Sequence, residues 1–510
     1  MIKSKFFKTN GQTIFLGLVI IVFYFITRLI NLTIIPVFCD EAIYIRWAQV
    51  MRADSTLRFL PLSDGKQPLF MWLVIPFLKV IKDPLVAGRL VSVLSGLGTM
   101  IGIFVLSFLL FENICFATLS SIFYLTSPFA FFFDRMALAD GLLSCFGVWC
   151  LVFGVSLVKK IRLDLAMISG IILGLALITK SPSMFFALLI PAMILFFDFK
   201  KKNRLVHLGK LVVLWLVVYL FAFAIYNILR LGPEFHMIAL RNKDYIFSLN
   251  EVLKHPLNPF LGNFKNLVNW FWILATPPVF IFGLLGILIG FKKNLKTAIF
   301  LLVWLAVPLV VQSAVAKVFT ARYVLFSLPL FLIFSTWFLE TVLAIKDKKL
   351  AIILGIVTFV FPIYQIYLLS SHPDMAWLPV QERKGYLEEW TSGYGIRQAS
   401  LYLRKVAEKE KVLVGTEGYF GTLPDGLQIY LEKVPNVTVI GVGYPIKEIP
   451  VKLINSLVDN RVFLLVNDSR FEVKDNKGLN LIAKYPKAES ASRRMKIDSQ
   501  ENLLFFEILK

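Results

Sequence analysis

The sequence predicts a polytopic α-helical membrane protein with about 11 transmembrane helices and a C-terminal soluble α/β domain. Of its 510 residues, 57% are apolar, and the mean hydropathy is +0.73; soluble proteins are roughly 45–50% apolar. The formal net charge is +21, and the basic residues cluster in short runs between the apolar segments. That arrangement is typical of the cytoplasmic loops of membrane proteins and argues against a nucleic-acid-binding protein.

The first predicted span covers residues 12–30, and Lys3, Lys5 and Lys8 precede it. These charges predict a cytoplasmic N-terminus. The span has no small-residue cleavage site after it, so we expect it to be retained. The next apolar run, 68–81, is only 14 residues long and contains Pro76. We interpret it as an interfacial helix within a first outer loop, 31–85.

This choice fixes the remaining predicted spans, each near the roughly 20 residues that cross a bilayer. They are 86–111, 114–132, 141–158, 164–179, 183–199, 208–229, 269–290, 297–315, 323–343 and 350–370. The strongly basic runs 159–162, 200–204, 291–294 and 346–349 then all lie on the cytoplasmic side. The predicted transmembrane domain is therefore 1–370, in a multi-pass protein of the cell membrane.

The remaining residues, 371–510, are more polar and contain no further predicted span. A helical pattern at 395–409 lies among short β-like runs, which are 411–417, 437–442, 461–467 and 502–509. Alternation of this kind predicts a small α/β domain. The number of preceding spans places it outside the cytoplasm.

Ionisable residues gather at the predicted outer face, although charges at membrane depth are costly and usually line a cavity. The candidates are Asp40, Glu41, Lys66, Arg89, Asp134, Arg135, Asp140, Lys180, Lys317 and Arg322, with Tyr44 and Tyr323 beside them. Each has a structural alternative. Asp140 fits a helix N-cap, the pair Asp40 and Glu41 fits a first helical turn, and Arg89 fits a snorkelling side chain.

Together these residues suit sugar transfer from a lipid phosphate. Such an enzyme needs a carboxylate that takes a proton from the acceptor hydroxyl and cations that stabilise the leaving phosphate. Lysine and arginine both suit a phosphate. The sequence has no Cys/His spacing typical of a metal site, so we expect no required cofactor. An acidic pair can still hold Mg²⁺ or Mn²⁺.

Several motifs occur in an order that resembles one membrane enzyme family. They are "DEAIY" (40–44), "GKQPLF" (65–70), "AGRLVSVLSG" (87–96), "FDRMALAD" (133–140), "GLALITKSP" (174–182) and "SAVAKVFTARYVLF" (313–326). In these motifs the chain is similar to the GT-C superfamily of polyprenyl-phosphate-sugar glycosyltransferases. The likeness is greatest to the branch of the protein O-mannosyltransferases and the lipid A aminoarabinose transferase, over roughly residues 12–345.

The resemblance implies residue roles. Asp40 would be the catalytic base or its acidic orienter, with Glu41 beside it, and Asp140 would be the second acidic residue. Lys66 would bind the lipid phosphate. Lys180 and Lys317 would be further phosphate-side or pocket residues. From their place at the predicted outer face, Arg89 and Arg322 are also predicted to bind the donor phosphate. Tyr44, Asp134, Arg135 and Tyr323 are further candidates.

Two departures from the family pattern bear on metal binding and the phosphate site. Gly65 stands where the aminoarabinose transferase has a glutamate before its phosphate-binding lysine, and the loop "IALRNKDYIF" (238–247) has no counterpart of its histidine. The resemblance covers no part of 371–510.

The sequence therefore predicts an inverting glycosyltransferase that moves a sugar from a polyprenyl-phosphate donor to an extracytoplasmic acceptor. A protein hydroxyl, a lipid and a cell-surface glycan all remain open as acceptors. The alternatives are a transporter or flippase of lipid-linked glycans, a non-catalytic membrane scaffold, and an oligosaccharyl transferase that uses a pyrophosphate donor and a metal. One-sided charge placement argues against a transporter, whose sites lie at mid-bilayer.

Overall fold

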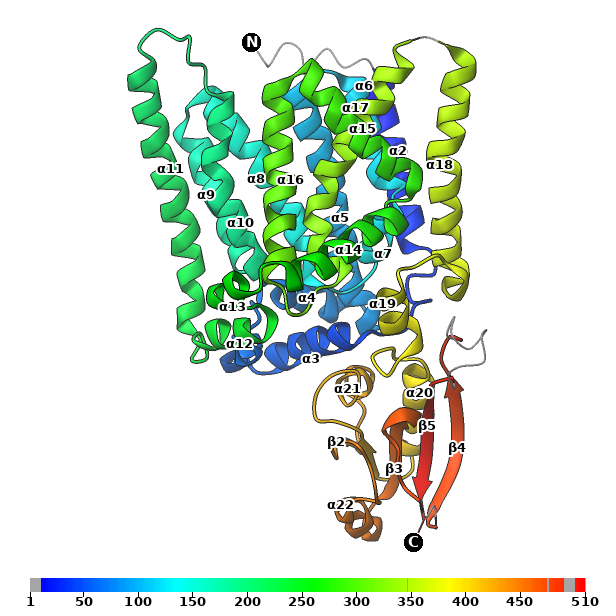
Figure 1. The fold of residues 1–510 in the computed structure, drawn as a ribbon. Helices are drawn as coiled ribbons and strands as arrows, with labels where there is room; N and C mark the ends of the chain where they lie inside the picture. The colour runs from blue at the N-terminus through cyan, green and yellow to red at the C-terminus, as the bar shows by residue number, and fades with distance from the viewer. Residues whose placement is uncertain (1–10, 346, 475–476, 490–499, 510) are drawn as a thin grey trace. The chain divides into compact units, whose positions relative to one another are not determined.

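A computed structural model describes residues 11–345, 347–474, 477–489 and 500–509. The chain divides into two compact units (Figure 1). Unit 1 comprises Met1–Ile30, Phe59–Phe70 and Val91–Ser370, and unit 2 comprises Asn31–Arg58, Met71–Leu90 and Ser371–Lys510. The expected functional division into 1–370 and 371–510 stays a prediction. Lys3, Lys5 and Lys8, on which the expected N-terminal orientation depends, lie outside the described residues.

Unit 1 is almost entirely helical because its sequence consists of long apolar runs. Its longer helices are α2 (Gly11–Leu29), α6 (Ile114–Leu125), α8 (Ala139–Lys160), α9 (Leu163–Leu177), α11 (Arg204–Tyr226), α14 (Leu257–Leu274), α15 (Pro277–Lys293), α16 (Leu295–Val315), α17 (Leu328–Leu343) and α18 (Lys348–Ser371). The shorter ones are η2 (Leu60–Asp64), α7 (Pro128–Asp134), η3 (Ser181–Ser183), α10 (Met184–Leu189), η4 (Ile190–Phe196), η5 (Asn227–Leu231), α12 (Met237–Tyr245), α13 (Leu249–Lys254) and η6 (Ala321–Ser327). The helices α4 (Leu69–Val80) and α5 (Pro84–Phe111) cross the boundary between the units, and the last residue of α18 also belongs to unit 2.

The structure confirms a polytopic membrane protein but not the expected count of 11 spans. Within the described residues, six helices are long and apolar enough to cross a membrane, or eight if each of two bent pairs is one span. The bent pairs are α6 with α7, at 61°, and α14 with α15, at 115°. In the described residues, the expected spans at 12–30, 164–179 and 183–199 fall in apolar helical segments of 10–17 residues, which are Ile14–Leu29, Leu163–Leu177 and Ser181–Phe196.

Prolines explain where the expected spans differ from the observed helices. The span expected at 269–290 is wrong as one straight helix, because the chain turns at Thr276, with φ 75°, before Pro277. The span expected at 114–132 is broken in the same way before Pro128. Proline lacks the N–H that a continuing helix needs and favours the first helical position.

Helices α15 and α17 pack very closely, side by side in Figure 1. A Cβ on Gly286 would lie only 1.9 Å from the carbonyl oxygen of Phe334. Small residues permit this kind of backbone approach between membrane helices.

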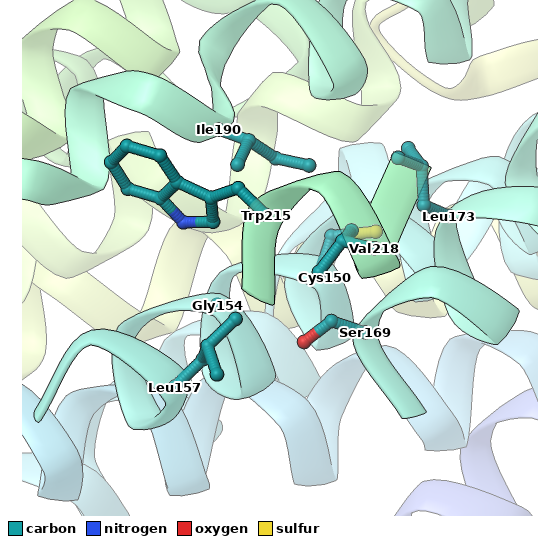
Figure 2. Close-up of a pocket in the computed structure, with 8 residues that line it drawn as sticks. All are labelled: Cys150, Gly154, Leu157, Ser169, Leu173, Ile190, Trp215 and Val218. Atoms are coloured by element: carbon teal, nitrogen blue, oxygen red, sulfur yellow. The ribbon is translucent and has the colours of Figure 1, made fainter. Parts of the chain in front are cut away.

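A small void lies among α8, α9, α11 and η4, and Figure 2 shows the side chains around it. Its volume is about 10 Å³, and its lining includes Trp215, Ile190 and Leu173. That space is near the size of one water molecule. We therefore interpret it as a feature of helix packing, not as a substrate cavity.

Unit 2 contains a five-stranded sheet with the order β2-β1-β3-β5-β4, drawn in gold to red in Figure 1. The strands are β1 (Val412–Thr416), β2 (Val437–Gly441), β3 (Arg461–Asn467), β4 (Leu479–Pro486) and β5 (Asn502–Ile508). β2, β1 and β3 are parallel, whereas β5 and β4 are antiparallel. Four strands were expected from the sequence; β4 was missed.

The sheet buries both faces, as strand residues alternate in direction. One face holds a core that includes Leu413, Val462 and Phe506. On the other face, Phe463 and Phe505 stack 5.5 Å apart against Tyr402 of α20 (Ile396–Ala407). The expected α/β domain is therefore confirmed.

The helices of unit 2 include one from the first loop. They are α3 (Cys39–Ala53), η1 (Ser55–Leu57), η7 (Pro373–Met375), α19 (Val380–Arg383), η8 (Lys384–Glu388), α20, α21 (Asp425–Leu431), α22 (Val451–Asn455), η9 (Ser456–Val458) and η10 (Asp468–Arg470). α3 packs against α21. Asp40 thus belongs to the same compact unit as the C-terminal sheet.

Candidate active site

The acidic pair that opens α3 has two unlike environments. Asp40 is partly exposed, whereas Glu41 is completely buried. Glu41 accepts a hydrogen bond from the backbone N–H of Phe38 at 3.0 Å and closes the first turn of the helix. Tyr44, also buried, lies one turn further along and stacks on Trp47.

Glu41 forms a buried, two-point ion pair with Arg89. Nε and one terminal nitrogen of Arg89 lie 2.8 Å and 2.7 Å from the two carboxylate oxygens. The same guanidinium donates to the carbonyl oxygens of Leu32, Ile35 and Pro36. Arginine's planar fork suits this geometry.

These contacts bear on two roles expected from the sequence. Arg89 is wholly buried and its donors are directed at Glu41 and at the loop backbone. We therefore interpret Glu41 and Arg89 as positioning residues that hold the chain before Asp40, in place of the catalytic and phosphate-binding roles expected for them.

The C-terminal part of unit 2 also holds the segment before Asp40. Phe38 and Ser392 form an antiparallel bridge. The N–H of Cys39 donates to Thr391 at 3.1 Å, and Gly393 donates to Val37 at 2.9 Å. The side chain of Asp40 is thus presented from a backbone fixed on two sides.

A second group of candidate residues converges in unit 1. Asp140, in the first turn of α8, lies 2.5 Å from Nζ of Lys180. That nitrogen also lies 4.2 Å from the ring centroid of Tyr323, and Arg322 faces the same ring at 5.4 Å. Four residues predicted from three separate motifs are therefore brought together by α8, η3 and η6.

Lys66 lies on a segment that adjoins Lys180. Gln67 donates to the hydroxyl of Ser181 at 2.8 Å, and the N–H of Leu69 donates to Ile178 at 3.2 Å. Lys66 directly precedes Gln67, and Lys180 directly precedes Ser181, so this hydrogen bond brings the backbones of the two lysines close together. The structure therefore brings Lys66, Lys180, Asp140, Arg322 and Tyr323 into one region of unit 1.

Two residues that were not among the sequence candidates complete the surroundings of Lys66. Asp64 lies 3.3 Å from Nζ of Lys66 and 2.6 Å from Arg241 of α12. Arg241 also pairs with Asp244, and the carboxylate of Asp64 raises the pKa of Arg241. Asp64 could have been found from the sequence, because it is an acidic residue only two positions before the candidate Lys66.

The described contacts of Lys317 are with a different part of unit 1. It is exposed, donates to the carbonyl oxygen of Lys243 at 2.9 Å and lies 5.2 Å from the ring of Phe247. Among the contacts described here, Lys317 is joined to the last turn of α12 and to Phe247 after it, and not to Asp140 or Lys180.

Asp134 and Arg135 belong to buried structural contacts in unit 1. Asp134 accepts from Tyr124 at 2.9 Å and pairs with Arg28 at 3.5 Å, all three wholly buried. Arg135 donates to the carbonyl oxygen of Ile30 at 2.9 Å. A buried charge that loses its partner is strongly destabilising, so we interpret the pairing of Asp134 with Arg28, and the backbone contact of Arg135, as structural.

The described residues contain no group of three or more His, Cys, Asp or Glu side chains that could hold a metal ion. The acidic pair at Asp40 and Glu41 does not supply two ligands to one ion, because Glu41 is directed at Arg89.

Comparison with known proteins agrees with the motifs. Residues 65–226 match the sequence model of the dolichyl-phosphate-mannose-protein mannosyltransferase family. The apo structure of ArnT from Cupriavidus metallidurans aligns with a TM-score of 0.56 and 14% identity, over 97% of this chain and 98% of that one. The same protein bound to undecaprenyl phosphate aligns with a TM-score of 0.55 and 14% identity, over 98% of both chains.

An archaeal structure aligns as well. The oligosaccharyltransferase of Archaeoglobus fulgidus gives a TM-score of 0.53 and 12% identity, over 90% of this chain and 70% of that one. The chain has the GT-C fold. A search of curated protein sequences finds no significant relative. The resemblance seen in the motifs is thus confirmed, and the alignments with ArnT extend over nearly the whole chain.

Proposed function

We propose that this GT-C protein is an inverting glycosyltransferase that transfers a sugar from a polyprenyl-phosphate donor to an acceptor hydroxyl outside the cytoplasm. The observation that carries the proposal is the convergence of Lys66, Asp140 and Lys180, all within the region that matches the mannosyltransferase family, with Tyr323 beside Lys180. Support for the lipid comes from ArnT, whose structure was solved with undecaprenyl phosphate.

In this mechanism Asp40 acts as the general base. The acceptor oxygen attacks the anomeric carbon, its proton passes to the Asp40 carboxylate, and the bond from that carbon to the phosphate oxygen breaks. Polyprenyl phosphate leaves with the bonding electrons. A single displacement inverts the anomeric centre.

The cations of unit 1 serve the leaving group. Lys66 and Lys180 bind the phosphate as point charges, and Arg322 adds a fork of donors. Asp140 orients Lys180 through their ion pair. Cations that meet charge as it develops lower the barrier more than cations that bind the ground state only.

The test uses purified full-length protein in membranes, a panel of radiolabelled polyprenyl-phosphate sugars, and the variant Asp40→Asn. Wild type should release or transfer one sugar, and Asp40→Asn should lower the rate by at least about 100-fold, as removal of a general base does. The matched control is Asp164→Asn, an exposed carboxylate paired with Arg162, which should retain full activity.

Equal turnover by wild type and Asp40→Asn would exclude Asp40 as the base. A donor that binds but is moved across the bilayer without bond cleavage would replace the proposal by a flippase. Failure of folded wild type to bind any donor of the panel would overturn the lipid-phosphate assignment.

A further inference from the structure

An open groove lies within unit 2, beside the helix that carries Asp40. Its volume is about 340 Å³. Its lining comes from α3, α21, the residue that follows each of these helices, and β2. Nothing in the proposed chemistry uses this groove.

One wall is a single face of α3. Arg46, Gln49, Val50 and Ala53 are spaced three, four and seven residues apart, and residues at this spacing lie on one side of a helix. The wall is fixed against α21, because Gln49 donates to the carbonyl oxygen of Ile429 at 2.9 Å.

The same two helices are held at the far end of the groove by a second contact. Arg52 pairs with Glu432 at 2.6 Å, and both side chains are mostly buried. The groove is therefore bounded by two helices whose separation is set by specific bonds.

The other wall is the outer edge of β2, which is the last strand on its side of the sheet. Asn436 and Val442 direct backbone groups to β1. Since successive residues of a strand alternate, Val437 and Val439 direct their N–H and C=O groups away from β1. Both residues line the groove. Gln428 lies 3.4 Å from the carbonyl oxygen of Val439, a long hydrogen bond that confirms this direction.

The lining chemistry favours one class of occupant. The residues that line the groove include no aromatic ring for a sugar to stack on. They offer aliphatic side chains, from Val50, Leu431 and Val439, next to the backbone of an edge strand. Edge strands bind extended polypeptides by adding a strand, and neighbouring side-chain pockets supply specificity.

We propose that the groove binds an extended segment of a polypeptide acceptor as an added strand on β2. This rests on the proposed function, since it assigns the acceptor of that reaction. The Arg46 and Asp54 side chains contact polar side chains of the segment, and the aliphatic residues contact its apolar ones.

The position of the groove on α3 fits such an acceptor. At 1.5 Å of rise per residue, Arg46 lies about 9 Å and Ala53 about 20 Å along the helix from Asp40. An extended peptide covers about 3.3 Å per residue. A segment that places its hydroxyl at Asp40 therefore puts the residues about three to six positions away in the groove.

The decisive variant is Val439→Pro. It removes an N–H that points away from the sheet, and proline is tolerated on the outer side of an edge strand. The control is Thr438→Ala, because Thr438 is exposed and its backbone is directed to β1. Binding is followed by hydrogen exchange of the Val437 and Val439 amides in the full chain, with a library of short peptides that carry a central Thr.

Peptides should slow exchange at Val437 and Val439, and the same peptides N-methylated at alternate residues should not. Val439→Pro should weaken peptide binding about tenfold, as loss of one buried hydrogen bond does, while Thr438→Ala binds as wild type. Protection by an oligosaccharide panel and not by peptides would overturn the proposal, as would equal peptide binding by Val439→Pro.

The outcomes separate this proposal from the proposed function. Peptide binding should persist in Asp40→Asn, which has its catalytic base removed, and donor hydrolysis without acceptor should be the same in Val439→Pro and wild type. Peptide protection without any donor turnover would refute the transferase and leave the groove assignment standing. Donor turnover with no peptide protection would refute the groove alone.

Discussion

At the scale of single residues, the ion pair between Glu41 and Arg89 decides how Asp40 is presented. Both side chains are buried, and Arg89 also bonds to three carbonyl oxygens of the preceding loop. Glu41→Gln leaves a buried guanidinium without its counter-charge. Breaking such a pair from one side typically costs about 3–5 kcal/mol in the free energy of unfolding. The measurement is denaturant or thermal unfolding of the full chain.

An exposed pair provides the matched control for that prediction. Arg162 and Asp164 lie 2.5 Å apart, with side chains more than half exposed. Asp164→Asn should leave the unfolding midpoint almost unchanged, because solvent screens surface pairs. If Glu41→Gln lowered the free energy of unfolding no more than Asp164→Asn does, the pair of Glu41 and Arg89 would not hold the loop before Asp40.

The candidate residues themselves could be predicted from the sequence, but their partners could not. Asp140 and Lys180 were selected because of their position at the ends of predicted spans, and in the structure they form an ion pair. Glu41 and Arg89 were selected as well, yet their mutual pairing depends on how a loop folds back over 48 positions. No local sequence pattern shows that residues 48 positions apart will pair. From the sequence alone, a charged residue that pairs within the protein therefore could not be told from one that binds substrate.

At the scale of elements, the N-terminus of α21 carries a buried acid that makes unit 2 sensitive to pH. Burial raises the pKa of Asp425 to about 6. Weaker effects lower that pKa, including the hydrogen bond that Asp425 accepts from the N–H of Gly421 at 2.7 Å and the positive charge of nearby Arg46. The unfolded pKa is about 3.9. Between those values the unfolded chain has released a proton that the folded chain retains, so stability falls as pH rises through about 4 to 6 and is then constant.

Asp425→Asn should abolish this fall, because asparagine keeps the acceptor oxygen and cannot ionise. The variant should gain up to about 3 kcal/mol relative to wild type between pH 4 and pH 7. Hydrogen exchange of the β1 amides, corrected for intrinsic rates, measures the opening free energy. Parallel pH profiles for the two proteins would show that folding does not raise the pKa of Asp425.

Elements were predicted best where periodicity and length agreed. The runs 86–111 and 297–315 correspond to α5 and α16, and four strands of unit 2 lie in the short apolar runs expected from the sequence. The expected helix at 269–290 failed because it averaged apolar content across Thr276 and Pro277. β4 was missed because its outward residues, such as Asn480 and Lys484, interrupt a short apolar pattern.

At the scale of the whole molecule, the basic runs predict which ends of the helices face the cytoplasm. Lys202 follows η4 and Lys293 ends α15, both exposed, whereas Asp459 is exposed in the sheet unit. Positive charges are retained on the cytoplasmic side during insertion. In a background without Cys39, Cys115, Cys145 and Cys150, we expect an impermeant maleimide added to intact cells to label Asp459→Cys but not Lys202→Cys or Lys293→Cys. In permeabilised cells all three cysteines should be labelled, which controls for their reactivity. Labelling of Lys202→Cys and Lys293→Cys but not Asp459→Cys in intact cells would contradict the prediction. It would place Asp40 and the groove on the cytoplasmic face, where an extracytoplasmic acceptor could not reach them.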